Sequence, residues 1–189
     1  MARDESVTVK GSPVRSLQKF IEGQLTPEQR ESVLGALPAD YAKRLRGPIL
    51  ATETIPVSVL NDMTEAAAKA KDEPLDAFAR RAGREAAGDA VKGIYRFFAL
   101  MATPAGLLGR AAQMWSGLYN RGEMRVDNQT DRSATIKLVD FPSEPAGCAR
   151  ISGWLERMGE LTGAKNVRVV QTQCYAKGAP HCQWTIDWQ

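Results

Sequence analysis

The sequence predicts an α+β fold in which a helical N-terminal region precedes an antiparallel sheet. Apolar residues recur at helical spacing as far as Tyr119, and prolines divide this part of the chain into separate helices. At Gly122 the period of the apolar residues changes from about 3.6 residues to about 2, which is typical of strands. A second helical pattern then separates two alternating segments. This order of helices, hairpin, helix and hairpin is typical of an α+β domain with an antiparallel sheet.

The composition is that of an ordinary globular protein, and its charge does not point to nucleic acid. Of the 189 residues, 43% are hydrophobic and 25% are charged, and the net charge is only +3. The densest basic group, Arg80, Arg81 and Arg84, lies on a helical pattern with Asp76 and Glu85 nearby. We interpret it as a solvated helix face, with a phosphate-binding patch as the alternative. Nucleic acid is therefore not an expected partner.

The sequence contains no pattern typical of export or of a membrane span. The N-terminus is charged and leads into no apolar segment. The longest uncharged stretch, 97–109, is broken by Pro104 and is too short to cross a bilayer. We therefore expect a cytoplasmic protein in a reducing compartment. Three cysteines, an odd number, are also poor material for disulfides there.

Four short helices are predicted in the first third of the chain. They begin near prolines, at Pro13, Pro27, Pro38 and Pro56. The clearest start is Thr26-Pro27, where threonine caps the helix and proline occupies its first position. We assign residues 1–73 to an N-terminal helical region and residues 74–189 to an α+β domain.

The longest predicted helix runs from Leu75 to Met101. Its middle contains glycines, among them Gly83, and each costs about 1 kcal/mol relative to alanine. Such small residues let another helix approach closely, either from the same chain or from a second subunit. Because the helix is apolar on more than one side, we expect a homodimer with Gly83, Ala87 or Ala90 near its two-fold axis. Cover by the four N-terminal helices is the alternative.

The remaining elements follow from the spacing of apolar residues. A helix is predicted from Thr103-Pro104 to Tyr119, and another carries an apolar stripe from Ile151 to Leu161 and ends at Gly163. Strands are predicted around residues 124–128, 134–138, 167–171 and 184–188.

No catalytic motif is present, so we do not expect an enzyme. The sequence has no phosphate-binding glycine loop and no nucleophile elbow. His181, the only histidine, precedes Cys182 in a strand, where adjacent side chains point to opposite faces. It is therefore badly placed as a general base, and we expect an exposed strand residue. A haem with a histidine axial ligand is also disfavoured, because the chain has no other histidine.

The three cysteines form a candidate metal site. Cys174 and Cys182 flank a tight loop between antiparallel strands, an arrangement that brings their sulfur atoms close together. Cys148 lies just before a predicted helix, and it joins them if the start of this helix covers the loop. The spacing is compatible with a metal site or with three independent buried thiols.

The end of the chain resembles a known family. The segment from Cys174 to Trp184, which reads CYAKGAPHCQW, is similar to the signature ending of 4-vinyl-reductase domains. Phe141-Pro142 and Gly153-Trp154-Leu155 also fit this family, which is related to TRAPP vesicle-tethering subunits and to haem nitric-oxide-binding domains. Almost the whole chain also resembles a paralogous bacterial family of myxobacteria, on less specific features such as Thr103-Pro104.

This resemblance implies a four-stranded antiparallel sheet with helices packed on one face. It also implies a structural zinc ion, because Cys148, Cys174 and Cys182 match the order and spacing of the cysteine ligands in phenol-responsive members of the family. Gln171 stands where those members have a glutamate ligand. A neutral amide is a weaker zinc ligand, so Gln171, His181 or a water would supply the fourth position.

In this family, small apolar molecules, tetrapyrrole precursors or lipid chains occupy the space between helices and sheet. The residues that could line such a space here are Tyr95, Phe97, Phe98, Trp115, Tyr119 and Trp154. The alternative is that they form plain core. We hypothesise a non-catalytic binding or sensor module for a small apolar molecule or lipid, with a signalling partner protein. The alternative function is a dimeric adaptor that acts through protein contacts.

Overall fold

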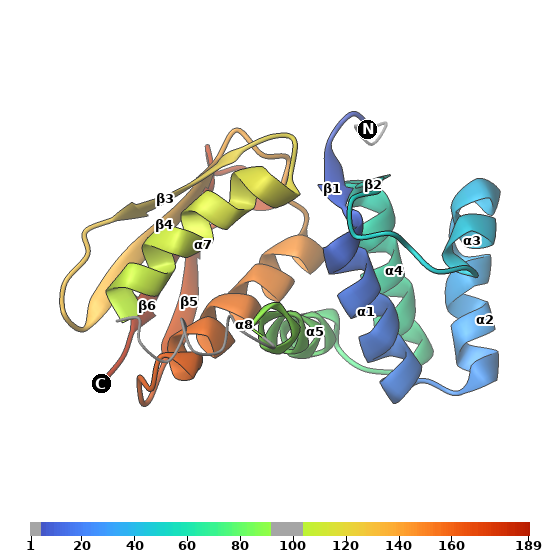
Figure 1. The fold of residues 1–189 in the computed structure, drawn as a ribbon, viewed down its shortest axis with the longest axis horizontal. Helices are drawn as coiled ribbons and strands as arrows, with labels where there is room; N and C mark the ends of the chain where they lie inside the picture. The colour runs from blue at the N-terminus through green and yellow to red at the C-terminus, as the bar shows by residue number, and fades with distance from the viewer. Residues whose placement is uncertain (1–4, 92–103) are drawn as a thin grey trace.

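The computed structural model describes residues 5–91 and 104–189, and it confirms the predicted α+β fold. Figure 1 shows the N-terminal helices beside a sheet and its covering helices, with α5 (Leu75–Ala90) and α8 (Pro145–Leu161) between them. Helix α5 contacts two N-terminal helices as well as α8. The domain boundary after residue 73 therefore stays a prediction. Among the described helices, none combines the length and the hydrophobicity that a membrane span requires.

The N-terminal part contains the predicted helices α1 (Gly11–Gln24), α2 (Pro27–Gly35), α3 (Ala39–Leu45) and α4 (Val57–Ala70). Helix α2 begins with a capping box, in which Thr26 and Gln29 each accept a hydrogen bond from the backbone of the other. Two strands, β1 (Thr8–Lys10) and β2 (Thr54–Pro56), pair antiparallel directly before α1 and α4. They were not predicted, since three residues are too few to show an alternating pattern.

The sheet contains four antiparallel strands in the order β3-β4-β6-β5. These are β3 (Glu123–Asp127), β4 (Ser133–Val139), β5 (Arg168–Gln173) and β6 (Cys182–Asp187), with the turn η1 (Tyr175–Lys177) joining the last two. Ile136 lies opposite Trp184, and both are fully buried. Lys137 and Gln183 point to the other face and keep accessible surface. Helix α8 packs on β5 and β6, and α7 (Pro104–Leu118) packs on β3. The predicted sheet with helices on one face is thus confirmed.

Helices α5 and α8 pack backbone against backbone. A Cβ atom on Gly83 would lie 2.0 Å from the Arg150 carbonyl oxygen, and one on Gly153 would lie 2.0 Å from the Arg80 carbonyl oxygen. Ala87 is also completely buried, in a small cluster with side chains of α8. The close approach predicted for the small residues of α5 therefore occurs within one chain.

This packing corrects the predicted dimer surface. Gly83 and Ala87 are covered by α8 of the same chain, so they cannot lie at a two-fold axis. The helix predicted to reach Met101 is described only as far as Ala90, and residues 92–103 lie outside the described part of the chain. A homodimer through another surface stays a prediction.

The arginines of α5 are paired with carboxylates of the same chain. The pairs are Arg80 with Glu156 at 2.8 Å, Arg81 with Glu73 at 2.6 Å and Arg84 with Glu160 at 2.9 Å. All these side chains are partly exposed, so each pair contributes little to stability. The pairing supports the interpretation of this group as a solvated helix face.

Candidate functional site

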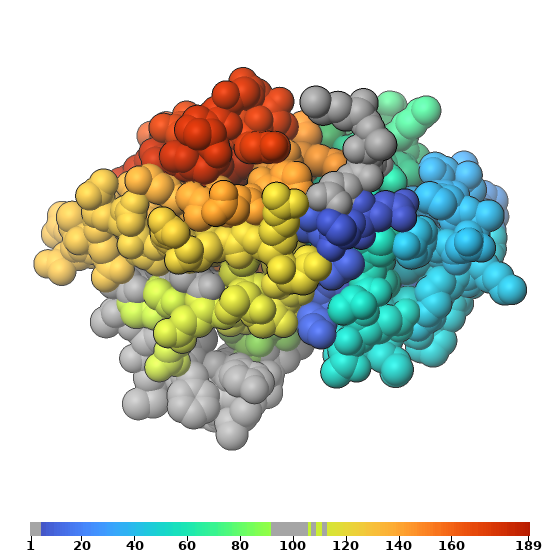
Figure 2. Space-filling view, turned by 90° about the horizontal axis from the view of Figure 1, so that it is seen from above, coloured from blue at the N-terminus to red at the C-terminus, as the bar shows by residue number. Residues whose placement is uncertain are grey.

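A cavity of about 1160 Å³ lies between the N-terminal helices and the helices that cover the sheet. Its walls come from α1, α4 and α5 on one side, and from α7, α8 and residues 141–144 on the other. Figure 2 shows the N-terminal helical region and the strands as adjoining lobes of the molecule. Residues from both parts of the chain therefore enclose the cavity.

Helix α5 makes room for the cavity because it presents small side chains to it. Ala82, Gly83, Ala86 and Ala90 all line the cavity. Larger apolar side chains from α1, α4 and α8, such as Leu17, Leu60 and Ile151, form the opposing walls. A mostly apolar cavity with a few polar groups is the usual form of a small-molecule site.

Three aromatic rings form one corner of the cavity. Trp115 and Tyr119 of α7 are stacked with their centroids 4.0 Å apart, and Phe141 stands edge-on to them at 5.0 and 5.5 Å. The indole N–H of Trp115 donates to the Arg121 carbonyl oxygen at 3.2 Å. Burial raises the pKa of Tyr119, so its phenol stays neutral and keeps its proton to donate.

The predicted ligand residues fall into two groups. Trp115, Tyr119 and Trp154 line the cavity. Tyr95, Phe97 and Phe98 lie outside the described residues. Phe141 was missed as a lining residue, because its sequence position after a strand does not show that its ring meets α7. Ligand binding by any of these residues stays a prediction.

Arg150 of α8 places a guanidinium group in the cavity wall. Its Nη1 atom donates to the Leu60 carbonyl oxygen at 2.9 Å and to Thr64 Oγ1 at 2.5 Å, and its Nη2 atom donates to Asn61 Oδ1 at 2.9 Å. Burial lowers the pKa of Arg150, but a guanidinium stays charged at neutral pH. Arg150 was not predicted as a site residue, because a lone cation beside Ile151 gives no sign of where its side chain points.

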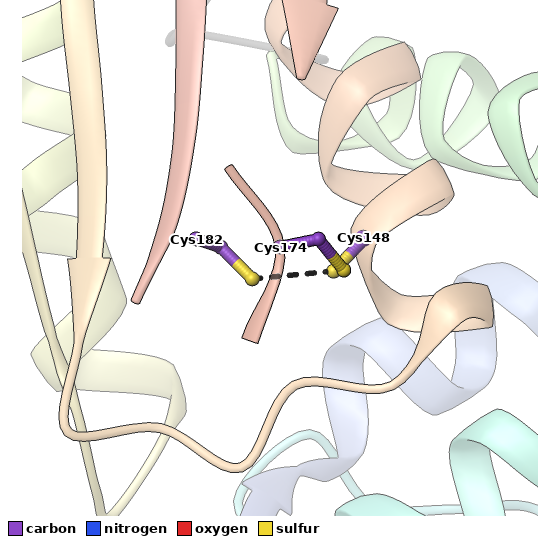
Figure 3. A group of neighbouring side chains, drawn as sticks. All are labelled: Cys148, Cys174 and Cys182. Carbon is purple, nitrogen blue, oxygen red and sulfur yellow. Dashed lines mark hydrogen bonds between the residues drawn. The ribbon is translucent and has the colours of Figure 1, made fainter. Parts of the chain in front are cut away.

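The three cysteines lie together where the start of α8 meets the ends of β5 and β6 (Figure 3). The sulfur atoms of Cys148, Cys174 and Cys182 are within 4.8 Å of one another, and all three side chains are buried. Within the described residues, no histidine, aspartate or glutamate joins this group. None of the three is among the described residues that line the cavity.

A hydrogen bond couples two of these thiols. The sulfur atoms of Cys148 and Cys182 are 3.5 Å apart. The hydrogen bond that the Cys148 thiol donates lowers the pKa of Cys182 to about 6. The backbone N–H of Tyr175, which donates to the Cys182 sulfur at 3.3 Å, also lowers this pKa. The same pairing, together with burial, raises the pKa of Cys148. Of these two thiols, Cys182 is therefore the more acidic one.

Gln171 and His181 lie near this cysteine group. The Gln171 amide opposes the rise in the pKa of Cys148, and its side chain shares the face of the sheet with Trp184. The Nε2 atoms of Gln171 and His181 are buried without a hydrogen-bond partner among the described residues. His181 is thus partly buried rather than exposed as predicted. A metal-binding role for Gln171 and the three cysteines stays a prediction.

Burial predicts slow thiol chemistry in the folded protein. Cys182 has no exposed surface, and Cys148 and Cys174 are only 2% and 8% exposed. Ellman's reagent at about pH 8 is therefore expected to modify the native thiols slowly, despite the low pKa of Cys182, and to titrate all of them rapidly in urea. Rapid modification of Cys182 in the native protein, identified by mass spectrometry, would show that the cluster opens to solvent.

No protein-family model and no curated relative matches this sequence, but its fold is similar to solved structures of H-NOX proteins. The Fe(II) unliganded H-NOX protein from K. algicida has a TM-score of 0.73 at 12% identity, over 95% of this chain and 96% of that one. An H-NOX protein from S. oneidensis in the Fe(II)NO ligation state has a TM-score of 0.69 at 14% identity, over 95% and 99%. An oxygen-binding H-NOX domain related to soluble guanylate cyclases has a TM-score of 0.66 at 12% identity, over 95% of this chain and 95% of that one. At these identities the likeness concerns the fold alone.

The assignment to the 4-vinyl-reductase type is therefore wrong. The similar structures are H-NOX proteins, and they match 95% of the chain, including its N-terminal helices. The segment from Cys174 to Trp184 comprises a turn and half of one strand. So short a local pattern does not specify the order of the elements that precede it.

Zinc as the cofactor is also wrong. The similar proteins are described with Fe(II) and with haem, not with zinc. In this chain, Gln171 offers only a neutral amide beside the three cysteines, and no carboxylate or histidine of the described residues joins them. We therefore assign no zinc to the cysteine cluster.

A histidine-ligated haem does not fit this cavity either. Haem iron is held by an axial side chain, which in globins and peroxidases is histidine. His181 is the only histidine of the chain, lies next to the buried Cys182, and is not among the residues that line the cavity. The cavity is lined mainly by apolar side chains, and it offers no histidine to iron.

Proposed function

We propose that this protein is a non-catalytic binding module that holds a small, mostly apolar molecule between its two parts. The cavity itself carries this proposal. Its volume of about 1160 Å³ is large enough for a ligand, since ligand pockets typically have volumes of roughly 300–1000 Å³. Such a volume has room for a lipid chain or a ring system. An apolar cavity of this size also loses packing contacts when it is empty, which favours an occupant.

A ligand in this cavity would contact both parts of the chain at once. It would stabilise the folded form by mass action, and it would shift any equilibrium between two arrangements of the parts. These properties support a sensor that acts on a signalling partner protein. The similar H-NOX structures, which are described in NO, CO and oxygen complexes, also support small-molecule binding, although the cavity here has no histidine for haem iron.

The adaptor function is less well supported. An adaptor of this fold would fill the ligand space with side chains, whereas this chain presents Ala82, Gly83 and Ala86 to a large cavity. Of the α5 residues proposed for dimer contact, Gly83 and Ala87 are covered by α8, whereas Ala90 is exposed and lines the cavity. A homodimer is compatible with ligand binding, which does not depend on it.

Blocking the cavity is expected to weaken binding without unfolding the chain. Ala86 lines the cavity and is only partly buried, so Ala86→Trp places an indole ring in the cavity. We expect an affinity for the neutral apolar dye Nile red that is at least about tenfold weaker than that of the wild type, or about 1.4 kcal/mol. Fluorescence titration measures this loss. Ala36→Trp, at the exposed residue after α2, is the matched control.

A second readout does not depend on the dye. In native mass spectrometry, wild-type protein purified from its own source should carry a bound small molecule, and Ala86→Trp should carry less of it. Equal dye binding by both proteins, together with the bare mass of the chain, would show that the cavity is not a ligand site.

A further inference from the structure

We propose that the ligand carries an anionic group of the carboxylate class, and that Arg150 binds this group inside the cavity. The inference rests on the proposed function and adds the chemistry of the ligand to it. It follows from the position of Arg150, from its unused donors and from its lack of a carboxylate partner.

The guanidinium of Arg150 lies in the interior and faces the cavity. Its acceptors Asn61 and Thr64 are 1% and 0% exposed, so the side chain reaches deep between α4 and α8. Arg150 nevertheless keeps accessible surface, and it lines the cavity. A ligand in the cavity could therefore contact this cation away from bulk water.

Arg150 has hydrogen-bond donors to spare. A guanidinium has five N–H donors, and three of them are used by Leu60, Asn61 and Thr64. Nε–H and one Nη2–H have no acceptor among the described residues. A carboxylate can accept two hydrogen bonds from one guanidinium, which makes it the natural ligand for these two donors.

The charge of Arg150 is also uncompensated at close range. Its three acceptors are neutral, and no carboxylate of the described residues forms an ion pair with it. Two carboxylates, Glu144 in the cavity wall and Glu65, favour its charged form only through longer-range electrostatics. By contrast, Arg80 and Arg84 of α5 are both paired with glutamates. An interior cation without a counter-ion is costly, and an anionic ligand would remove that cost.

The rest of the cavity suits the apolar body of such a ligand. Leu60 and Ile151 lie on the walls that flank Arg150, and Tyr119 is near enough to interact with it electrostatically. The neutral phenol of Tyr119 could donate a further hydrogen bond to a carboxylate. Lys19, by contrast, is 63% exposed and already pairs with Asp89 at 3.0 Å. The arrangement fits one anionic group at Arg150 and an apolar chain or ring in the remaining volume.

Matched pairs of ligands test this inference on the full chain. Dodecanoate is compared with 1-dodecanol, and 1-pyrenebutanoate with 1-pyrenebutanol, by displacement of Nile red. Each carboxylate should bind at least about tenfold more tightly than its alcohol, because only the carboxylate pairs with Arg150. The comparison between the two pairs distinguishes a chain-like ligand from a ring-like one.

Two variants locate the preference. Arg150→Met keeps a long apolar side chain but removes the charge, and it should abolish the preference for carboxylates while the alcohols still bind. Arg132→Met removes an exposed cation that does not line the cavity, and it should leave the preference intact. Arg150→Lys keeps the charge without the paired donors, and it should retain only part of the preference.

Each outcome decides one question. Equal binding of carboxylate and alcohol by the wild type overturns the role of Arg150 but leaves the binding function standing. A preference that survives in folded Arg150→Met also overturns it. If all four compounds fail to bind and Ala86→Trp behaves as the wild type, the proposed function fails as well. If Arg150→Met does not fold, the wild-type ligand pairs and Arg150→Lys still decide the inference.

Discussion

Replacing Gly83 by alanine is expected to destabilise the protein strongly, although alanine is the better helix former. A Cβ atom at this position would lie 2.0 Å from the Arg150 carbonyl oxygen, so α5 and α8 would have to separate. We expect a loss of about 3 kcal/mol in the free energy of unfolding. The melting temperature, followed by circular dichroism, should fall by roughly 10 °C. Gly153→Ala, which would meet the Arg80 carbonyl oxygen at the same distance, should behave alike.

Gly88 provides the control on the same helix. A Cβ atom there would have no neighbour within 4 Å, so Gly88→Ala should stabilise the protein by up to about 1 kcal/mol. The double variant of Gly83 and Gly153 should cost less than the sum of the two single changes, because one separation of the helices relieves both clashes. A rise in melting temperature for Gly83→Ala would contradict the close crossing of α5 and α8.

Replacing Trp184 by alanine should have an effect of similar size, from the centre of the sheet. The indole has no exposed surface, and its Nε1–H donates to Ser152 Oγ of α8 at 2.9 Å. Removing it leaves a large void beneath α8 and should lower the free energy of unfolding by about 3–5 kcal/mol. Urea unfolding followed by far-UV circular dichroism measures the change.

Two further variants separate the contributions at this position. Trp184→Phe keeps most of the ring but loses the hydrogen bond to Ser152, so it should cost less than alanine, by a margin that reflects the retained packing. Val170→Ala, at a partly exposed residue of β5, should change the stability by only about 0.5 kcal/mol. A small effect of Trp184→Ala would mean that the sheet face is not closely packed against α8.

The elements were predictable wherever a local signal specifies the structure. The alternation of Ala134, Ile136 and Leu138 gave both the strand β4 and its buried face, because successive strand residues point to opposite sides. The cap and proline at Thr26-Pro27 marked the start of α2 correctly. The strands β1 and β2 were missed because neighbouring segments, rather than their own three residues, hold them in place.

The candidate sites could be predicted only in part. The tight loop between Cys174 and Cys182 accounts for their approach, whereas Cys148 reaches them only because α8 packs on β5 and β6. The likeness of the chain end to one family led to a wrong family and to a wrong metal. A turn and part of a strand recur in different folds, while the match to H-NOX structures depends on the arrangement of nearly the whole chain.

The sequence by itself determined where most helices and strands begin, which residues of the sheet face the core, and that the chain has a single histidine. It also predicted that the glycines of α5, Gly83 among them, let another element approach closely. Only the tertiary structure decided that the element approaching Gly83 is α8 and that the cavity lies between the two parts of the chain. It also decided that Arg150 faces this cavity while it donates to neutral acceptors on α4. The physical reason is that periodicity shows which side of an element is apolar, but not which distant segment covers that side.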